Sequence, residues 1–335
     1  MTEQAIPGDG AGQELAFRCS RGARERSDPF FATAPPAQRW LLVEHPGPWG
    51  PQALSGAGFD AHLVAAIDVF CREYGARFQL IRRTAARGVP SGNGGRFAVV
   101  DSRVGHETAR WGSVDSPADL PAALADLDAS TTPSSEPFYL VCTHGRHDAC
   151  CAMRGRPVAA VLAAAHPERT WETTHTGGDR FAANAILMPH AIVLGQVDAT
   201  EALAIAERYD AGEVVAHGMR GRAGLAPAVQ GAQHHARLAW DEHGVDAFAP
   251  LGTTQADDGV WTVLLDGGHR GQLTVVVRER WIPSPTPLTC NAAGTASMRT
   301  YDLLTLHPVP AGSGSGSGSG SADENPDVVG VSARA

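Results

Sequence analysis

The sequence predicts an α/β protein in which one small unit occurs twice, followed by a C-terminal α+β segment. Two stretches, 39–127 and 138–209, each show the pattern of a strand, a helix, three strands and a second helix. Residues also match at equivalent places in the two stretches. RFAVV (96–100) parallels RFAAN (180–184), and WGSVDSPADL (111–120) parallels LGQVDATEAL (194–203). A repeat of both order and sequence predicts an internal duplication.

The first stretch opens with RWLLVEH (39–45), a short apolar run typical of a buried strand. PGPWG (46–50) ends this strand, because proline and glycine break the ladder of hydrogen bonds. An apolar stripe predicts a helix over 59–75, with Gly75 at its C-terminal stop. The remaining elements are strands at 77–83, 96–103 and 108–114 and a helix at 116–127, in which Ser116 is the N-cap and Pro117 the first helical residue.

The second stretch repeats this order. Its predicted elements are a strand at 138–143, a helix at 156–165 with Pro157 near its start, a strand at 170–175, a hairpin of 185–188 with 192–197, and a helix at 199–209. The C-terminal segment differs. Its predicted elements are a helix at 223–240, a hairpin of 259–266 with 272–281, and strands at 288–290 and 298–306.

Five segments follow from this organisation. They are a flexible tail at 1–13, an N-terminal unit at 14–132, a second unit at 133–210, a C-terminal α+β segment at 211–308, and a disordered Gly/Ser and acidic tail at 309–335. The N-terminal unit has Pro, Trp and Gly where the second has Cys and His. We therefore expect it to lack a metal centre and to serve a structural or docking role.

Composition excludes several classes of protein. The net charge of −9 argues against a general binder of nucleic acid or anionic membranes. No apolar run approaches the roughly 18 residues of a membrane span, and the start has no secretory signal pattern. The six cysteines are unevenly scattered over a long chain, which does not indicate a disulfide framework. We expect a cytoplasmic protein whose cysteines include metal ligands.

Two segments rich in thiol and imidazole indicate a metal centre. Cys142 closes a predicted strand, and Cys150 and Cys151 follow after a glycine-containing loop, just before a helix. His175 closes the next strand and is followed by TGG and Asp179. Strand-end loops that are neighbours in one sheet can bring these groups to one point, and thiolates are soft donors suited to iron–sulfur iron and to zinc. The spacing is not CxxC…CxxC, which disfavours a zinc ribbon.

At these residues the chain resembles a known family. CTHGRHDACC followed by HTGGDRFAAN is similar to the sucrase/ferredoxin-like family, whose fungal members carry a thioredoxin-like ferredoxin domain. RWLLVEHPGPWG and AILMPHAIVLGQV extend the likeness over most of residues 14–210. The resemblance implies a thioredoxin-like ferredoxin fold and a [2Fe–2S] cluster held by two cysteines and two histidines.

Carried over to this chain, the family pattern assigns three ligands and changes the fourth. Cys142 and Cys151 match the two cysteines, because eight residues lie between them, and His175 matches the first histidine. The second histidine position holds Asp179, and a carboxylate there should favour ferric iron and lower the reduction potential. An N-cap of the following short helix is the alternative use of Asp179. The rivals for the fourth ligand are Cys150, His144, His147 and Cys290.

The other polar side chains near this motif have simpler interpretations. Cys150 is expected to be a spare thiol under the helix, Cys19 and Cys71 to be core or incidental residues, and Cys290 to be buried in a strand. Four arginines surround the proposed centre, and a solvated face is favoured over a docking face for an acidic redox partner: Arg146, Arg154, Arg156 and Arg180.

We therefore expect a non-enzymatic electron carrier or redox sensor with an unidentified redox partner protein, and neither a nucleic acid nor a membrane as partner. No P-loop, nucleophile elbow or Rossmann glycine pattern occurs, and no carboxylate pair can be assigned to glycoside hydrolysis. Two alternatives remain. One is a structural zinc site in an interaction protein. The other is a thiol oxidoreductase that uses Cys142 with Cys150 or Cys151.

Overall fold

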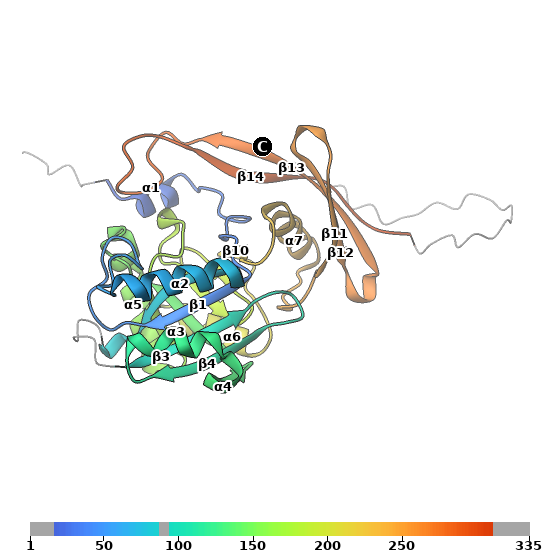
Figure 1. Cartoon of the computed structure of the whole chain (residues 1–335). Helices are drawn as coiled ribbons and strands as arrows, with labels where there is room; N and C mark the ends of the chain where they lie inside the picture. The colour runs from blue at the N-terminus through green and yellow to red at the C-terminus, as the bar shows by residue number, and fades with distance from the viewer. Residues whose placement is uncertain (1–16, 87–93, 311–335) are drawn as a thin grey trace, which may run out of the picture.

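A large mixed sheet forms the body of the protein, and a smaller antiparallel sheet lies beside it (Figure 1). The computed structural model describes residues 17–86 and 94–310, apart from the side chain of Asp257. The predicted tail at 1–13 lies outside the described residues, as does the predicted tail from residue 311 onward. The large sheet has ten strands in the order β10-β9-β8-β6-β7-β2-β1-β3-β4-β5, and the smaller sheet has the order β11-β12-β13-β14.

The two halves of the large sheet share one topology. In the first half β1 is parallel to β2 and antiparallel to β3, which is antiparallel to β4. In the second half β6 is parallel to β7 and antiparallel to β8, which is antiparallel to β9. The halves join edge to edge where β2 pairs antiparallel with β7. Both halves therefore contain the predicted order of strand, helix, three strands and helix.

The bounds of these elements are as follows. The first half contains β1 (Arg39–Glu44), α2 (Ala61–Tyr74), β2 (Ala76–Arg82), β3 (Gly95–Asp101), β4 (Thr108–Val114) and α3 (Leu120–Ala125). The second half contains β6 (Phe138–Cys142), α5 (Ala149–Ala165), β7 (Thr170–Thr173), β8 (Ala185–Met188), β9 (Ile192–Leu194) and α6 (Ala202–Asp210). Edge strands β5 (Thr131–Ser134) and β10 (Met219–Arg222) extend the sheet on its two sides.

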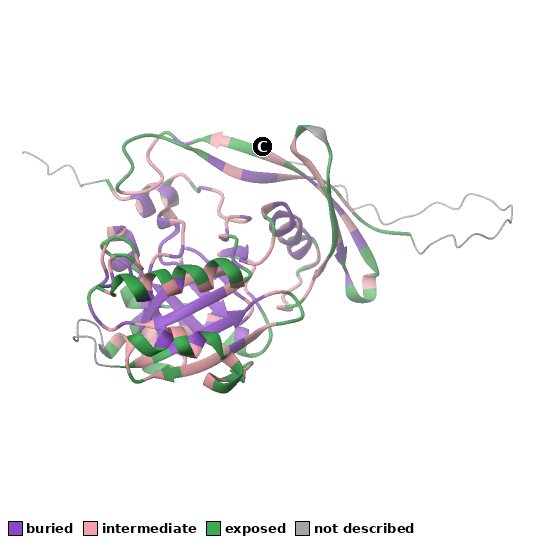
Figure 2. Ribbon diagram, viewed as in Figure 1, coloured by how far each residue is buried: buried purple, intermediate pink, exposed green. Residues whose placement is uncertain are grey.

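Both faces of the large sheet are buried, and most of its strands are purple in Figure 2. Successive residues of β1 point to opposite faces, so Leu41 and Val43 pack with α2 and α3 while Trp40 and Leu42 pack on the other side. In the second half, Tyr139 belongs to the cluster that packs β6 against α5 and α6. Because the sheet is covered on both sides, every residue of β6 is buried, and its sequence FYLVC is a continuous apolar run.

The predicted helices are all present with shifted bounds, and those expected at 116–127 and 156–165 differ most from the structure. The helix expected at 116–127 divides into a 3-10 turn (η2, Pro117–Asp119), α3 and α4 (Leu127–Ser130). The backbone of Asp126 is not helical and its carboxylate caps α4, which separates α3 from α4. The helix expected at 156–165 begins earlier, at Ala149, because Asp148 caps it, and Pro157 therefore lies inside the helix and not near its start.

The C-terminal segment packs α7 (Pro227–Trp240) against the antiparallel sheet of β11 (Pro250–Gln255), β12 (Val260–Asp266), β13 (Gln272–Pro283) and β14 (Ser297–Pro308). The predicted hairpin of 259–266 with 272–281 is confirmed as β12 and β13. The strand expected at 288–290 is wrong, because these residues lie in the loop that joins β13 to β14. This long hairpin reaches across the molecule to α1 (Cys19–Glu25), as Figure 1 shows.

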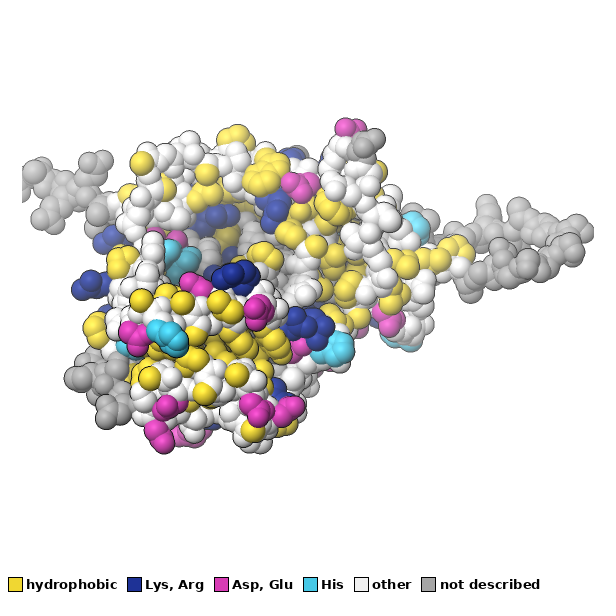
Figure 3. Space-filling view, in the orientation of Figure 1, with side chains coloured by type: hydrophobic (Ala, Val, Ile, Leu, Met, Phe, Trp, Pro, Cys, Tyr) yellow, Lys and Arg dark blue, Asp and Glu magenta, His cyan; other side chains and the backbone are white. Residues whose placement is uncertain are grey.

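An apolar groove lies between α2 and α3 on the face seen in Figure 3. Its volume is about 610 Å³, and its lining includes Val69, Phe70 and Leu124. Within the described residues, none of the helices is both long enough and apolar enough to cross a membrane.

Candidate metal centre

The predicted donors come together at the ends of two neighbouring strands. Cys142 is the last residue of β6, and in the parallel register of β6 and β7 it lies beside Thr173, the last residue of β7. His175 follows two residues later. Cys151 lies in the first turn of α5, the helix that connects these two strands. The sheet therefore places both strand-end loops at one edge, and the helix brings the second sulfur to them.

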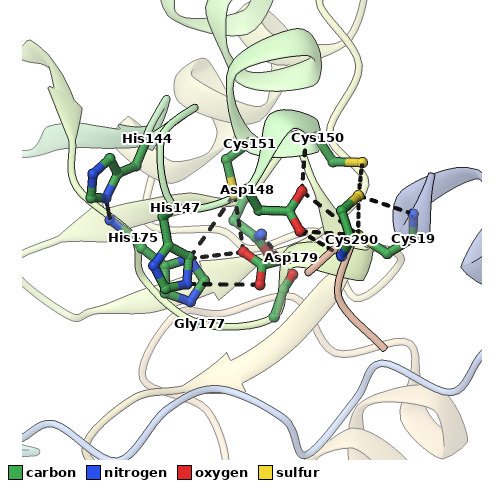
Figure 4. A network of polar contacts seen from close by, with 12 residues as sticks. Cys19, His144, His147, Asp148, Cys150, Cys151, His175, Gly177, Asp179 and Cys290 are labelled. Atoms are coloured by element: carbon green, nitrogen blue, oxygen red, sulfur yellow. Dashed lines mark hydrogen bonds and ion pairs between the residues drawn. The ribbon is translucent and has the colours of Figure 1, made fainter. Parts of the chain in front are cut away.

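The distances bring the four donors together in two overlapping sets that share Cys151 and His175. The sulfurs of Cys142 and Cys151 and a ring nitrogen of His175 all lie within 4.8 Å of one another. Asp179 Oδ1 is 2.9 Å from His175 Nδ1 and accepts a hydrogen bond of 3.2 Å from Cys151 Sγ (Figure 4). Both sulfurs are fully buried. The four residues that the family resemblance selected are therefore neighbours in space.

Asp179 does not act as a helix cap. It is the first residue of the 3-10 turn η3 (Asp179–Phe181), whose N-cap is Gly178, and no side chain caps this turn. The carboxylate instead faces His175 and Cys151. The interpretation of Asp179 as an N-cap is wrong, and its oxygens are directed at the other donors.

Burial and mutual hydrogen bonding set the charges of these groups without a metal. The Cys151 thiol donates to Cys142, and together with His175 this outweighs burial and lowers the pKa of Cys142 well below its ordinary value. The same contact and burial raise the pKa of Cys151. Burial lowers the pKa of His175, but Asp179 and Cys142 outweigh it and raise that pKa to about 9. Burial raises the pKa of Asp179, but His175 more than offsets this effect and the net shift is downward.

Two of the rival ligands are histidines, and the structure separates their roles. His144 Nδ1 accepts a hydrogen bond of 3.1 Å from the backbone N–H of His175, and its Nε2 donates to Gly50 O at 2.6 Å. With both nitrogens engaged, the His144 ring is held neutral and fixes the His175 backbone. The His147 ring stacks on the His175 ring at 3.7 Å, and its Nε2 lies 3.9 Å from Asp179 Oδ2. Of these two, His147 is the rival that can reach the centre.

The other two rivals belong to a different group of side chains. Cys150 and Cys290 lie with Cys19 and Asp148, all with donor atoms within 4.8 Å of one another. Cys19 is buried in a small core cluster with Cys150, which agrees with the expectation of a core residue, and the interpretation of Cys150 as a spare thiol stays a prediction. The expectation that Cys290 is buried in a strand is wrong, because Cys290 lies in a loop. Sequence spacing gave no sign of this group, because Cys19 and Cys290 are far from Cys150 along the chain.

Two further features position the donors, and sequence analysis did not single them out. A Cβ on Gly155 would lie 2.0 Å from the carbonyl oxygen of Cys142, so only glycine lets α5 approach the end of β6 this closely. The buried guanidinium of Arg220 donates to Gly177 O and to Asn184 Oδ1, both at 2.8 Å. Asn184 in turn donates to Gly178 O at 2.9 Å. These bonds hold the loop between His175 and Asp179.

The first half of the sheet covers the centre with the loop that follows β1. Gly50 O accepts from His144, Pro51 O lies 3.3 Å from His147 Nδ1, and the Trp49 ring meets the His144 ring edge-on. The Pro-Trp-Gly segment of the first half therefore contacts the imidazoles of His144 and His147 in the second half.

Three of the four arginines expected around the centre are exposed: Arg146, Arg154 and Arg156. The fourth, Arg180, has a side chain that is 13% exposed and lies 3.6 Å from the carboxylate of Asp28. Its charge is therefore partnered within the protein, and the exposed three belong to the solvated face.

The donor types fit an iron–sulfur cluster or zinc, since two thiolates and an imidazole are ligands of both. The donor spacing is compact: Cys151 Sγ lies 4.0 Å from His175 Nδ1 and 3.2 Å from Asp179 Oδ1, and the latter two atoms are 2.9 Å apart. Ligands of one tetrahedral ion lie about 3.3–3.8 Å apart, so this spacing is near that of a single-ion site.

Comparison with known proteins identifies the family. No curated protein and no solved structure matches the chain. The family model described as Sucrase/ferredoxin-like matches residues 30–221, which include all four donors and Arg220. The chain belongs to the sucrase/ferredoxin-like family.

Proposed function

We propose that this protein is a [2Fe–2S] protein that transfers single electrons or senses redox state, with the cluster held by Cys142, Cys151, His175 and Asp179. The observation that carries the proposal is the donor set itself: two buried sulfurs and one imidazole meet at the ends of β6 and β7, in the positions that the family pattern assigns to cluster ligands. When bound, the cluster supplies one-electron chemistry between ferric and ferrous iron. A reducing cytoplasm is the compartment that suits such free thiols.

Residues of this chain would set the reduction potential of the cluster and the side of the protein at which an electron enters or leaves. Two thiolates, one carboxylate and a neutral imidazole leave the oxidised centre less negative than four thiolates would. The Asp179 carboxylate favours the oxidised state relative to a second imidazole. The His175 side chain is 20% exposed and the His147 side chain 38%, whereas the sulfurs are buried. The histidine edge is therefore where a redox partner protein would approach.

We also infer that each half of the large sheet is a thioredoxin-like unit and that the two arose by duplication. The shared strand order and directions of β2-β1-β3-β4 and β7-β6-β8-β9 support this inference. Only the second half places cysteines at the loop after its first strand. The first half would then serve as a cover for the cluster, through Trp49 and Gly50.

A structural zinc site is the second candidate function, and the compact donor spacing favours it. Two sulfurs, one imidazole and one carboxylate form an acceptable tetrahedral set for zinc. A thiol oxidoreductase has less support, because both sulfurs are fully buried and a substrate disulfide could not reach them.

Metal and sulfide analysis of anaerobically purified protein separates these candidates. A [2Fe–2S] protein is brown, holds two irons and two acid-labile sulfides per chain, and loses its visible absorption on addition of dithionite. Cys142→Ser should abolish this absorption, while Cys71→Ser, on α2 and outside the centre, should leave it unchanged. A colourless protein with zinc that Cys142→Ser removes would reject the cluster in favour of zinc.

A further inference from the structure

We propose that Cys19, Cys150, Cys290 and Asp148 form a second metal site that holds a single zinc-like divalent cation and fastens the C-terminal hairpin to α5. These residues come from three distant segments: α1, the start of α5, and the loop between β13 and β14 (Figure 4). The inference does not depend on which group the first centre holds.

The sulfur positions match one tetrahedral ion. Cys290 Sγ lies 3.5 Å from Cys150 Sγ and 3.6 Å from Cys19 Sγ. An ion with zinc–sulfur bonds of about 2.3 Å holds its sulfurs about 3.8 Å apart, whereas a disulfide requires about 2.05 Å. All three cysteines are free, and three thiols cannot be satisfied by one disulfide.

Asp148 completes the set as an oxygen donor. Its carboxylate oxygens lie 3.6 and 3.8 Å from Cys19 Sγ. They also accept hydrogen bonds of 2.8 Å from the backbone N–H groups of Cys150 and Cys290. An ionised carboxylate has about four acceptor positions, so each oxygen keeps one for a metal. These bonds orient the carboxylate as second-shell contacts orient metal ligands.

The surroundings suit an anionic cluster that needs a cation. Asp148 is 1% exposed, Cys19 0% and Cys150 2%, so the carboxylate and two of the sulfurs are shielded from water. The backbone N–H of Cys19 donates to Cys290 Sγ, a contact that stabilises a thiolate. The group also lies at the positive N-terminal end of the long helix α5. A bound dication would offset the charge of the carboxylate and of the deprotonated sulfurs.

The two groups are separate although Cys150 and Cys151 are adjacent. Consecutive residues of a helix point about 100° apart, so the two sulfurs face different directions. Cys151 Sγ contacts Asp179, whereas Cys150 Sγ contacts Cys290. The second group offers three thiols and one carboxylate with no vacant position among them, which is typical of a closed structural site. Cys₄ iron–sulfur clusters need a fourth cysteine, and Cys71 lies elsewhere, on α2.

Metal analysis of the full-length chain tests the site. Protein purified without chelators should retain one zinc per chain in addition to the group at the first centre. Cys290→Ser should lower zinc affinity by more than about 100-fold, measured by competition with a chromophoric chelator, because it removes a direct ligand. Cys71→Ser is the matched control and should keep the wild-type affinity.

Cobalt substitution reports the ligands directly. Metal-free protein of the Cys142→Ser variant, in which the first centre is disabled, should bind one Co²⁺ with sulfur-to-metal charge-transfer bands and intense tetrahedral d–d bands. Zinc should displace this cobalt. Asp148→Asn keeps one oxygen, which can still accept from the Cys150 N–H and cap α5, but it loses the negative charge and the second oxygen. It should weaken binding while circular dichroism stays unchanged, which separates lost ligation from misfolding.

Several outcomes would overturn the site. They are a wild-type chain that takes up neither zinc nor cobalt beyond the first centre, retention of zinc at full affinity in both Cys19→Ser and Cys290→Ser, or a disulfide mapped between Cys150 and Cys290 in the purified chain. If the first centre holds zinc and not a cluster, the chain should carry two zinc ions. Cys142→Ser would then remove one and Cys290→Ser the other, so the two proposals fail independently.

Discussion

At the scale of single residues, Asp179 is the ligand that departs from the family pattern and changes the charge of the proposed cluster. Its carboxylate lies 2.9 Å from His175 Nδ1 and 3.2 Å from Cys151 Sγ, where the family pattern of the fungal members implies an imidazole. Replacing a neutral ligand by an anionic one stabilises the oxidised state. The cluster in this chain should therefore have a lower reduction potential than a cluster held by two cysteines and two histidines.

Asp179→His should keep the cluster and raise its reduction potential by on the order of 100 mV, because a neutral donor replaces an anion. A spectroscopic redox titration of the wild type and the variant measures this shift. Asp179→Ala should lose cluster or alter the spectrum. An Asp179→Ala protein with full iron, full sulfide and an unchanged spectrum would show that Asp179 is not a ligand.

His175 gives the metal-free protein a pH-dependent stability. Its pKa is raised to about 9, from about 6.5 in an unfolded chain. A raised pKa contributes stability that is fully present below pH 6.5 and is lost as the pH rises through about 9. The loss should amount to about 3 kcal/mol across that window.

Urea unfolding of the metal-free chain between pH 6 and 9.5 measures this effect. His175→Gln cannot titrate and should flatten the curve over the same window. The same proton competes with a metal for the ring, so metal affinity should rise with pH up to about 9. Equal pH dependence in the wild type and in His175→Gln would contradict the assignment.

At the scale of elements, helix α5 positions one cysteine in each of the two groups of thiols. Its first turn carries Cys150 towards the hairpin loop and Cys151 towards the strand ends. The position of this turn depends on contact between the helix and β6, and that contact is made at Gly155. A glycine in the middle of a helix costs about 1 kcal/mol relative to alanine, so its presence here is explained by the close approach.

Gly155→Ala should displace α5 from β6 and impair metal retention at the first centre. The added Cβ would lie 2.0 Å from Cys142 O, a backbone atom that cannot turn away. We expect a net destabilisation of about 1–3 kcal/mol despite the better helix propensity of alanine. Iron or zinc content and thermal unfolding measure the two effects.

Met153→Ala is the control for this substitution, since the Met153 side chain lies on the same helix and is 58% exposed. It should leave both metal content and stability close to wild type. A Gly155→Ala protein with full metal content and wild-type stability would mean that α5 is not held against Cys142 in this way.

The elements also show what local sequence can and cannot predict. The predicted bounds of β4 and β8 agree with the structure to the residue. AILM in β8 is an apolar run next to a turn, and in β4 Ala109 and Trp111 alternate with polar residues. β10 has the sequence MRGR, with no apolar pattern, and is nevertheless buried. It is stable there because the Arg220 guanidinium finds acceptors in Gly177 and Asn184, which no local pattern can reveal. The same limit applies to Cys19 and Cys290, whose partners are set only by the tertiary fold.

At the scale of the whole molecule, three separate parts of the chain meet around the proposed centre. The second half of the sheet supplies the donors, and the first half covers them through Gly50 and Pro51. The C-terminal hairpin reaches the same place, where Asn291 Nδ2 donates to His147 O at 2.7 Å. Its loop is also bonded to the segment after α1, through Arg26 and Thr286 at 2.6 Å. The C-terminal segment is therefore joined by a hydrogen bond to His147, which lies at the exposed histidine edge of the proposed centre.

Removal of the ion from the proposed second site should release this hairpin loop from α5. Cys290 is the only metal donor proposed in the loop, and without the ion the loop keeps the hydrogen bonds of Cys290 to Asp148 and Asn291 to His147. Hydrogen exchange should accelerate at least about tenfold over 284–296 and 144–151, equivalent to about 1.4 kcal/mol of lost protection, while β12 exchanges as before. Mass-spectrometric exchange on the wild type and Cys290→Ser measures this, with Cys71→Ser as the control. Equal exchange over 284–296 in all three proteins would mean that the loop is held without a metal.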